Sequence, residues 1–479
     1  MSKKIARRTS LDMTEGNPTS LLLKFAVPLL LGNFLQQTYN IVDSLVVGNY
    51  VGKEALGAVG SVMPVTFLFI SLFMGLAIGS TVIIAQYFGA KDKRNVQLTI
   101  ETIYKAYVVM SIVITALSLF FINDLLHLMG VPEDIFDFAK TYLSIIFLGY
   151  FALFGYNVNN SILQGVGDTI SSLYYLAIAV VINIVLDLLF VGYFSWGVAG
   201  AAYATVIANF CSFVFGVWHI NKREDGVRVR LFTKNFSGPI LREAYRLGIP
   251  AGLQNVIFSV GMLAVVRLVN SYGTNFIAGY NAAIKIDGLA FLPITSYASA
   301  TTAYVGQNIG ANRMDRVRKG VRAALRINFV TAAILAPLVV FMGPKLLSLF
   351  LDQYDPEVIA AGMAYLWRVV PFLWALGFLF IINSAIRGAG SSLMPMLITF
   401  FGLILGRVPL AYGLNHYFGR DNIFWSWPLG WALALVIAIT YYLSGRWHNK
   451  SRLQFSPELS NEKHGSAAGV ETCADADSK

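Results

Sequence analysis

Two acidic side chains, Asp43 and Asp187, lie inside long apolar stretches of this 479-residue chain. An ionisable residue within a membrane-spanning segment is costly, so it is a functional candidate by default. Asn183 precedes Asp187 by four residues, which places both side chains on one face of a helix. We interpret these three residues as the centre of a polar site.

Three more residues are candidates for this site: Tyr39, one turn before Asp43, and Asn160 and Thr205 on two other predicted helices. Carboxylate, amide and hydroxyl oxygens are the ligands that a small hard cation such as sodium prefers. Two carboxylates in a low-dielectric pocket can instead share and exchange a proton. The same residues can also simply join helices by hydrogen bonds. If sodium is the ion, its predicted ligands are Asp43, Asn183, Asp187 and Thr205.

Five other polar residues are candidates for lining a substrate cavity: Gln36, Asn40, Arg267, Lys285 and Asp287. Arg267 can also extend its guanidinium to the membrane surface along its apolar stem. Lys285 lies deeper in its predicted helix and can instead pair with a neighbouring helix. Lys285 and Asp287 are two residues apart and therefore face different directions.

The composition places these residues in a membrane protein, because 56% of the chain is hydrophobic and only 13% is charged. A bilayer can accommodate that much apolar surface, whereas a soluble domain cannot. About 20 mostly apolar residues cross a bilayer as a helix. The predicted helices cover residues 20–48, 54–84, 96–121, 136–164, 169–192, 198–218, 241–271, 276–307, 317–342, 357–386, 392–414 and 424–445.

The two halves of the chain repeat. Gln86-Tyr-Phe-Gly-Ala90 is matched by Gln307-Asn-Ile-Gly-Ala311, and Asn160 to Gly167 is matched by Asn383 to Gly390. Together with a third match, around Pro28 and Pro250, the spacing stays at 221 to 223 residues. We therefore predict an all-α membrane protein with twelve transmembrane helices in two six-helix repeated lobes around a central cavity.

The second half lacks the acidic residues of the first. Asp43 corresponds to Val265, and Asp187 corresponds to Leu410. Asn183 corresponds to Gly406, whereas Asn160 keeps an asparagine partner at position 383. We expect the ion-coupling site to lie in the first half only.

The basic residues predict the orientation. Lys and Arg gather in alternate connections, such as those around Lys93, Arg228 and Arg316, and such connections face the cytoplasm. Both termini are then cytoplasmic, and the net charge of +10 needs no nucleic acid to explain it. The predicted parts are a tail at 1–19, a lobe at 20–218, a linker at 219–240, a lobe at 241–445 and a disordered tail at 446–479.

Several function classes are disfavoured by what the sequence contains. The five histidines do not follow the spacing of a zinc site, and no glycine-rich phosphate-binding loop of an ATP-driven pump occurs. Only two cysteines occur, so no disulfide framework is indicated. We expect a transporter without a cofactor and not an enzyme or a receptor.

The motifs resemble the multidrug and toxic compound extrusion (MATE) family. The resemblance rests on Asp43-Ser-Leu-Val-Val-Gly48, Gly52 to Ala58, Gln86 to Ala90, Asn160 to Asp168 and Asn183-Ile-Val-Leu-Asp187, and it covers the chain up to the C-terminal tail. It implies two six-helix lobes in the cell inner membrane. It also implies export of amphipathic, often cationic compounds, including antibiotics, in exchange for protons or sodium.

The resemblance also places the cation site of the family. That site falls on Asp43, Asn183, Asp187 and Thr205, with Asn160 beside it and Tyr39 nearby. Members of the NorM branch carry further carboxylates in the second lobe, on the seventh and tenth helices. This chain has Arg267 and no acid there beyond Glu357, so it resembles the DinF-like branch more closely.

One rival remains within the same superfamily, a flippase for lipids or lipid-linked oligosaccharides. A pyrophosphate headgroup would need a strongly basic cavity, and only Arg267, Lys285 and Arg407 are candidates for one. We expect small organic substrates and a monomer within the bilayer. The sequence distinguishes neither the coupling ion nor the substrate.

Overall fold

The computed structural model describes residues 10–223, 226–230, 233–350 and 355–448, and its regular structure there is entirely helical. The first half contains α1 (Pro18–Tyr50), α2 (Lys53–Gly89), α3 (Lys93–Phe120), α4 (Ile122–Leu128), α5 (Glu133–Leu148), α6 (Tyr150–Gly165), α7 (Thr169–Asp187), η1 (Leu188–Tyr193) and α8 (Gly197–Lys222). The second half contains α9 (Gly238–Val269), η2 (Asn270–Tyr272), α10 (Thr274–Gly310), α11 (Met314–Ser348), α12 (Pro356–Val369), η3 (Val370–Phe372), α13 (Leu373–Gly388), α14 (Leu393–Phe400), η4 (Phe401–Arg407), α15 (Val408–Phe418), η5 (Arg420–Trp425) and α16 (Ser426–Leu443).

All twelve predicted ranges are helical over most of their length in the described chain, although some of them contain more than one element. Among the described residues, ten helices are long and apolar enough to cross a membrane, and the bent pair of α5 and α6 brings the number to eleven. The remaining predicted range is α10, which is 37 residues long. Its many small and hydroxyl-bearing residues lower its hydropathy below that of the other spans.

The predicted helix at 136–164 is in fact two helices. α5 and α6 meet at Gly149 with an angle of 49° between them. A Cβ atom on Gly149 would lie 2.2 Å from Cγ2 of Val206, so the bend follows the close approach of α8. In the second half the corresponding interruption is η3, which contains Pro371. Proline lacks the N–H that would continue the helical ladder.

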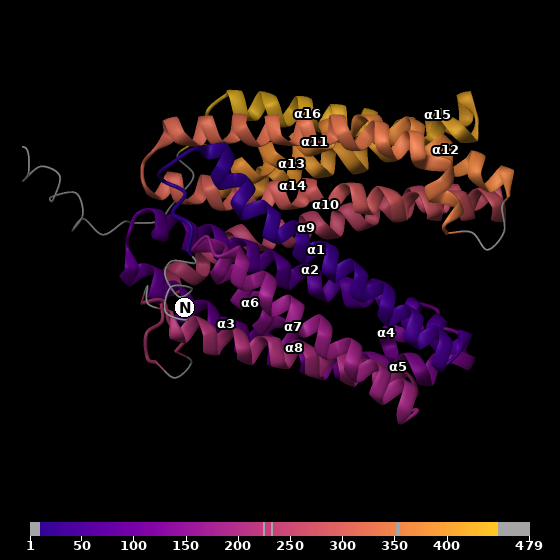
Figure 1. The fold of residues 1–479 in the computed structure, drawn as a ribbon, viewed down its shortest axis with the longest axis horizontal. Coiled ribbons are helices and arrows are strands. Elements are labelled where there is room, and N and C mark those ends of the chain that lie inside the picture. The colour runs from indigo at the N-terminus through magenta and orange to yellow at the C-terminus, as the bar shows by residue number, and fades with distance from the viewer. Residues whose placement is uncertain (1–9, 224–225, 231–232, 351–354, 449–479) are drawn as a thin grey trace, which may run out of the picture.

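The helices form two groups, which we call the first lobe (α1–α8) and the second lobe (α9–α16). Figure 1 shows the first lobe in indigo and magenta below the second lobe in orange and yellow. The lobes lie together near the N-terminal label and diverge toward the end where α4, α5, α12 and α15 are labelled. We call the end with the Lys- and Arg-rich connections α2–α3, α8–α9 and α10–α11 the basic end, and the other the opposite end.

Glycines bring the two lobes into backbone contact in the half of α2 nearer the basic end. A Cβ atom on Gly75 of α2 would lie 2.3 Å from the carbonyl oxygen of Gly248 in α9. Two helices in a membrane approach so closely only where small residues face each other. Gly57 and Gly60, near the other end of α2, have no atom within 4 Å of such a Cβ. On α2, the close backbone contact between the lobes therefore lies toward the basic end.

Two glutamines also connect the lobes at the basic end. Nε2 of Gln86 donates to the carbonyl oxygen of Gly388 at 2.8 Å, and Nε2 of Gln307 donates to that of Gly165 at 3.2 Å. The two glutamines are repeat partners, and so are the two glycines. The same contact is therefore made twice across the interface. This explains physically why both motifs occur in both halves.

The first helix contacts both lobes. Phe25 lies in an apolar cluster with second-lobe residues such as Ala303. Val47, nearer the other end of α1, packs in a cluster with Val191 of the first lobe. Pro28 lies inside the helix between these two contacts. A change in the shape of α1 therefore alters its contacts with both lobes.

Candidate functional site

Asp43 of α1 and Asp187 at the end of α7 form a buried acidic pair in the first lobe. Asp187 is fully buried, and Asp43 is half-buried. Their carboxyl groups lie within hydrogen-bonding reach of each other. A hydrogen bond between two carboxyl groups needs a proton on one of them, and two ionised carboxylates repel strongly in a low dielectric. The pair can therefore hold a proton or be bridged by a cation.

Asn183, Thr205 and Tyr39 surround this pair. With its amide oriented to satisfy both polar atoms, Asn183 donates to Oδ2 of Asp187 at 2.7 Å and accepts from the backbone N–H of Thr205 at 3.2 Å. The hydroxyl oxygens of Thr205 and Tyr39 are 3.3 Å apart. Three helices, α1, α7 and α8, thus bring together five of the six residues predicted for the site.

Tyr142 of α5 is a further member of the site. It lies close enough to Asp43, Tyr39 and Asp187 to interact electrostatically with all three. Nothing in its sequence surroundings singles it out, because an aromatic residue in an apolar helix is usually a packing residue. Tyr142 also packs against an apolar cluster at the opposite end of the first lobe, formed by Val46, Val47, Ala55, Val59, Val191, Val198 and Ala201.

The oxygen atoms of the pair fit a small cation or a proton. Oδ1 of Asp43 and Oδ1 of Asp187 are buried and have no hydrogen-bond partner among the described residues. Such acceptors are costly to leave unsatisfied. Sodium would be held by these oxygens together with those of Asn183 and Thr205, whereas a proton would satisfy one of them. The described residues contain no group of three or more His, Cys, Asp or Glu side chains that could hold a metal ion, so a zinc-type site is not formed there.

Asn160 lies apart from the pair, contrary to its predicted place beside it. Its Oδ1 accepts a hydrogen bond from the hydroxyl of Ser172 at 2.6 Å. Ser172 lies 15 residues before Asp187 on α7, a distance of about 22 Å at 1.5 Å per residue. Asn160 is therefore nearer the basic end, where it joins α6 to α7.

A cavity of about 380 Å³ lies mainly in the second lobe. It is lined by α9, α10, α13, α14, η4 and α16, and by first-lobe residues that include Thr81 and Gln164. Its charged lining residues are Arg387 and Arg407, and the others are amide, hydroxyl and apolar side chains. Small-molecule sites have volumes of roughly 300–1,000 Å³, so this cavity can take an organic compound.

The residues predicted to line a substrate cavity do not line this one: Gln36, Asn40, Arg267, Lys285 and Asp287. Lys285 is exposed, and its Nζ lies 5.3 Å from the centroid of the Phe350 ring. Arg267 is exposed as well. The rotation of α10 and α9 about their axes turns these cations away from the cavity, and the sequence does not fix that rotation.

Asp287 belongs instead to a buried cluster of the second lobe. The hydroxyl of Tyr365 donates to Oδ2 of Asp287 at 3.0 Å. Arg407 is 2% exposed, interacts electrostatically with Asp287, and stacks its guanidinium 3.7 Å from the centroid of the Trp427 ring. No spacing pattern predicts this cluster, because its members come from α10, α12, η4 and α16. The negative charge of Asp287 and the positive charge of Arg407 therefore offset each other within the second lobe.

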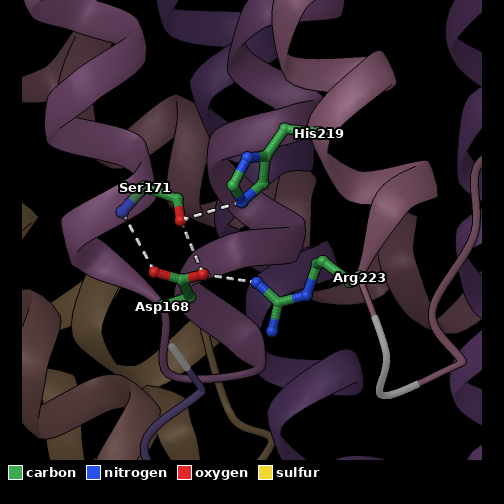
Figure 2. A network of polar contacts seen from close by, with 4 residues as sticks. All are labelled: Asp168, Ser171, His219 and Arg223. Carbon is green, nitrogen blue, oxygen red and sulfur yellow. Dashed lines mark hydrogen bonds and ion pairs between the residues drawn. The ribbon is translucent and has the colours of Figure 1, made fainter. Parts of the chain in front are cut away.

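A separate polar network lies at the basic end of the first lobe (Figure 2). Asp168 caps α7, because its carboxylate accepts from the backbone N–H of Ser171 at 3.0 Å and from the Ser171 hydroxyl at 2.8 Å. Arg223 forms an ion pair with the same carboxylate, and both side chains are at most 5% exposed. Nε2 of His219 lies 3.3 Å from the Ser171 hydroxyl. This network fixes the start of α7 to the end of α8.

Sequence comparison links the chain to a known family. The family model described as MatE matches residues 28–189 and 250–413, one stretch in each lobe. The chain is 31% identical over 442 residues to the probable multidrug resistance protein YpnP of Bacillus subtilis (strain 168). The alignment covers 91% of this chain and 97% of that protein. It is also 31% identical over 430 residues to the probable multidrug resistance protein YoeA of the same organism, with 87% and 92% covered.

Structural comparison gives a similar result. A solved structure described as the outward-facing conformation of a multidrug resistance MATE family transporter of the MOP superfamily superposes with a TM-score of 0.84. The sequence identity is 26%, and the match covers 91% of this chain and 97% of that one. The predicted all-α membrane fold is thereby confirmed.

Proposed function

The chain belongs to the MatE family, the multidrug and toxic compound extrusion transporters, and we propose that it exports amphipathic organic compounds in exchange for protons or sodium. It is a multidrug exporter and not an enzyme. The observation that carries the coupling proposal is the Asp43–Asp187 pair. Its two carboxyl groups come from different helices and lie within reach of each other in a buried environment.

The pair supplies a driving force for conformational change. Two carboxylates about 4 Å apart repel by roughly 4 kcal/mol at an effective dielectric of 20. A proton or sodium ion cancels this repulsion, so α1 and α7 move together when the ion binds and apart when it leaves. Pro28 gives α1 a place to bend, because its missing N–H weakens the helical ladder. Since α1 contacts both lobes, the movement reshapes the space between them.

Ion and substrate then oppose each other. If ion binding drives substrate release, each must weaken the binding of the other by the same factor. A transported dye is titrated at equilibrium against pH and then against sodium. We expect its affinity to fall as the coupling ion rises, and this dependence to vanish in Asp43→Asn. A dye affinity in the intact protein that ignores both ions would exclude competition through this pair.

Transport itself identifies the ion. Purified protein in liposomes is given an imposed proton gradient and then an imposed sodium gradient, and efflux of the dye is followed. Only the gradient of the true coupling ion should drive efflux. Efflux driven by neither gradient in active protein would overturn the proposal of secondary active transport.

Orientation follows from the basic end, which we place in the cytoplasm. Reporter fusions after Arg94, Arg230 and Lys319 should then read cytoplasmic. Fusions after Pro132, Ser195 and Asp352 should read external. Asp352 lies outside the described residues, but the connection that contains it follows α11 directly. A reversed reading at any of these six positions would break the orientation or the helix count.

The coupling site is confined to the first lobe, which favours the DinF-like branch over the NorM branch. The charged residue within the apolar part of α9 is Arg267, a base. In α12 and α13, the only acidic residue is Glu357, at the start of α12. A second ion site of the NorM kind would need carboxylates at these helices.

A further inference from the structure

We propose that the second-lobe cavity binds amphipathic organic anions, with Arg387 as the residue that pairs with their acidic group. This inference names a substrate class and rests on the proposed export function. The cavity has two arginines in its lining and no acidic side chain. A cation would meet only like charge there, whereas a carboxylate, sulfonate or phosphate would meet opposite charge in a low dielectric.

Arg387 lines the cavity and has a hydrogen-bond donor that no described residue satisfies. Its Nη2 donates to Oε1 of Gln254 at 2.6 Å, and its Nε is buried without a hydrogen-bond partner among the described residues. Gln254 is itself held by its Nε2, which donates to the Thr399 hydroxyl at 2.7 Å. A guanidinium carries five N–H donors in a planar fork that matches an oxyanion. Arg387 is therefore a positioned group with spare hydrogen-bonding capacity.

Arg407 adds positive charge at another part of the cavity wall. It forms no ion pair with any carboxylate of the described chain, and its Nε is also buried without a partner there. Its Nη2 makes only a weak contact of 3.7 Å with Sδ of Met262. Asp287 reduces its field but lies outside the cavity lining. An anion in the cavity would therefore be attracted chiefly by Arg387, with a smaller contribution from Arg407, whose charge Asp287 offsets in part.

The remaining lining suits an aromatic or aliphatic body. Phe258, Phe291, Phe380 and Trp431 supply apolar surface in the same cavity as Arg387. An apolar wall with a few positioned polar groups is the usual form of a small-molecule site. A compound with an apolar body and one acidic group fits this pattern.

The repeat indicates that the charge is specific to the second lobe. Arg387 corresponds to Gln164, because the two motifs are 223 residues apart (387 − 164 = 223). Both residues line the cavity, so the two lobes present an amide and a guanidinium to the same space. Replacing Arg387 by Gln would give both lobes the same side chain and remove the charge together with the guanidinium donors.

The test uses two dyes of one scaffold and opposite charge, fluorescein as the anion and rhodamine 123 as the cation. Equilibrium dialysis at pH 8 measures their affinity for the purified full-length protein in an uncharged detergent, with protein-free micelles as the blank. We expect fluorescein to bind more tightly than rhodamine 123. Arg387→Gln should weaken fluorescein binding by about 10- to 100-fold, since a hydrogen bond to a charged group contributes that much.

Two further variants control the experiment. Arg387→Lys keeps the charge and should retain more fluorescein affinity than Arg387→Gln. Arg326→Gln removes an exposed arginine of α11 that does not line the cavity, and it should leave both affinities unchanged. Rhodamine binding should not fall in Arg387→Gln. Tighter rhodamine than fluorescein binding, binding of neither dye, or an equal fluorescein loss in Arg326→Gln would overturn the inference.

Failure of this inference can be told apart from failure of the export proposal. Dye binding is measured without a gradient, so it does not depend on coupling. Asp43→Asn should keep fluorescein binding and lose gradient-driven efflux. If that variant still pumps while Arg387→Gln loses fluorescein affinity, the coupling site is wrong and the anion site stands.

Discussion

The two lobes share one helical pattern and differ in the charges they bury. Tyr142 and Tyr365 are repeat partners, because 365 − 142 = 223 is the spacing of the matched motifs. In the first lobe Tyr142 lies beside two acids, Asp43 and Asp187. In the second lobe Tyr365 donates to a single acid, Asp287, which has an arginine near it. The first lobe thus holds two buried acids next to each other, whereas the second lobe holds one buried acid with the opposite charge of an arginine near it.

This difference assigns different tasks to the lobes. A pair of buried acids needs a proton or a cation from outside, so its shape depends on the ion supply. Asp287 has the opposite charge of Arg407 near it and accepts a hydrogen bond from Tyr365, so its charge does not depend on an ion from outside. We therefore assign ion response to the first lobe and substrate binding mainly to the second.

The largest effect is expected from removing one charge of the acidic pair. Asp43→Asn and Asp187→Asn should each reduce gradient-driven dye efflux to the level of protein-free liposomes, because an amide neither exchanges a proton nor balances a bound cation. Asp287→Asn in the second lobe should retain gradient-driven efflux. Efflux from proteoliposomes measures all three, with size-exclusion profiles as the control for folding. Equal loss in Asp287→Asn would remove the distinction between the lobes.

The next effect concerns stability at the basic end of the first lobe, where Asp168 and Arg223 form an ion pair with both side chains at most 5% exposed. Asp168→Asn removes the carboxylate of the buried ion pair with Arg223 and should cost about 3–5 kcal/mol of unfolding free energy. The repeat partner of Asp168 is Ser391 (391 − 168 = 223), and Ser391→Ala should stay within about 0.5 kcal/mol. Denaturation of both variants in detergent gives the two values. Similar losses in both would show that the cost comes from the helix start and not from the ion pair.

A smaller effect separates the two tyrosines. Tyr365→Phe removes a hydrogen bond to a carboxylate and should cost about 1.5–3 kcal/mol of stability, without changing the ion dependence of efflux. Tyr142→Phe should instead change the ion concentration at which efflux is half-maximal. Thermal melting and ion titration of efflux are measured on both variants. A shifted ion titration in Tyr365→Phe alone would reverse the assignment of the lobes.

The smallest effect compares the two ends of α2. Gly75→Ala places a methyl group against the backbone of α9 and should cost about 1–3 kcal/mol by overpacking. Gly57→Ala has open space and should be neutral or slightly stabilising. Melting temperatures in detergent give the comparison. Gly75→Ala should also separate the lobes at the basic end, which distances between spin labels on α2 and α9 would detect. An unchanged distance and melting temperature would mean that this contact is not tight in solution.

The sequence alone determined the elements and the two acids. Long apolar runs must form membrane helices, since every backbone polar group has to be satisfied within the segment. Asp43 and Asp187 stand out because a charge in such a run has no ordinary explanation. The repeat of Gln86 and Gln307 was visible as a pattern, although its meaning as a contact between lobes was not. The bend at Gly149 was missed, because glycine in an apolar run does not by itself indicate a break.

Only the tertiary structure decided which polar residues meet. Tyr142 joins the acidic pair, Asn160 does not, and Lys285 faces Phe350 and not the cavity. Arg387 lies in the repeated motif Asn383 to Gly390, which the sequence marks only as a match between the halves, yet it lines the cavity of the second lobe. The physical reason is that helical periodicity fixes which residues share a face, whereas the rotation and spacing of packed helices decide what that face meets. Those two quantities come from contacts among residues far apart in the chain.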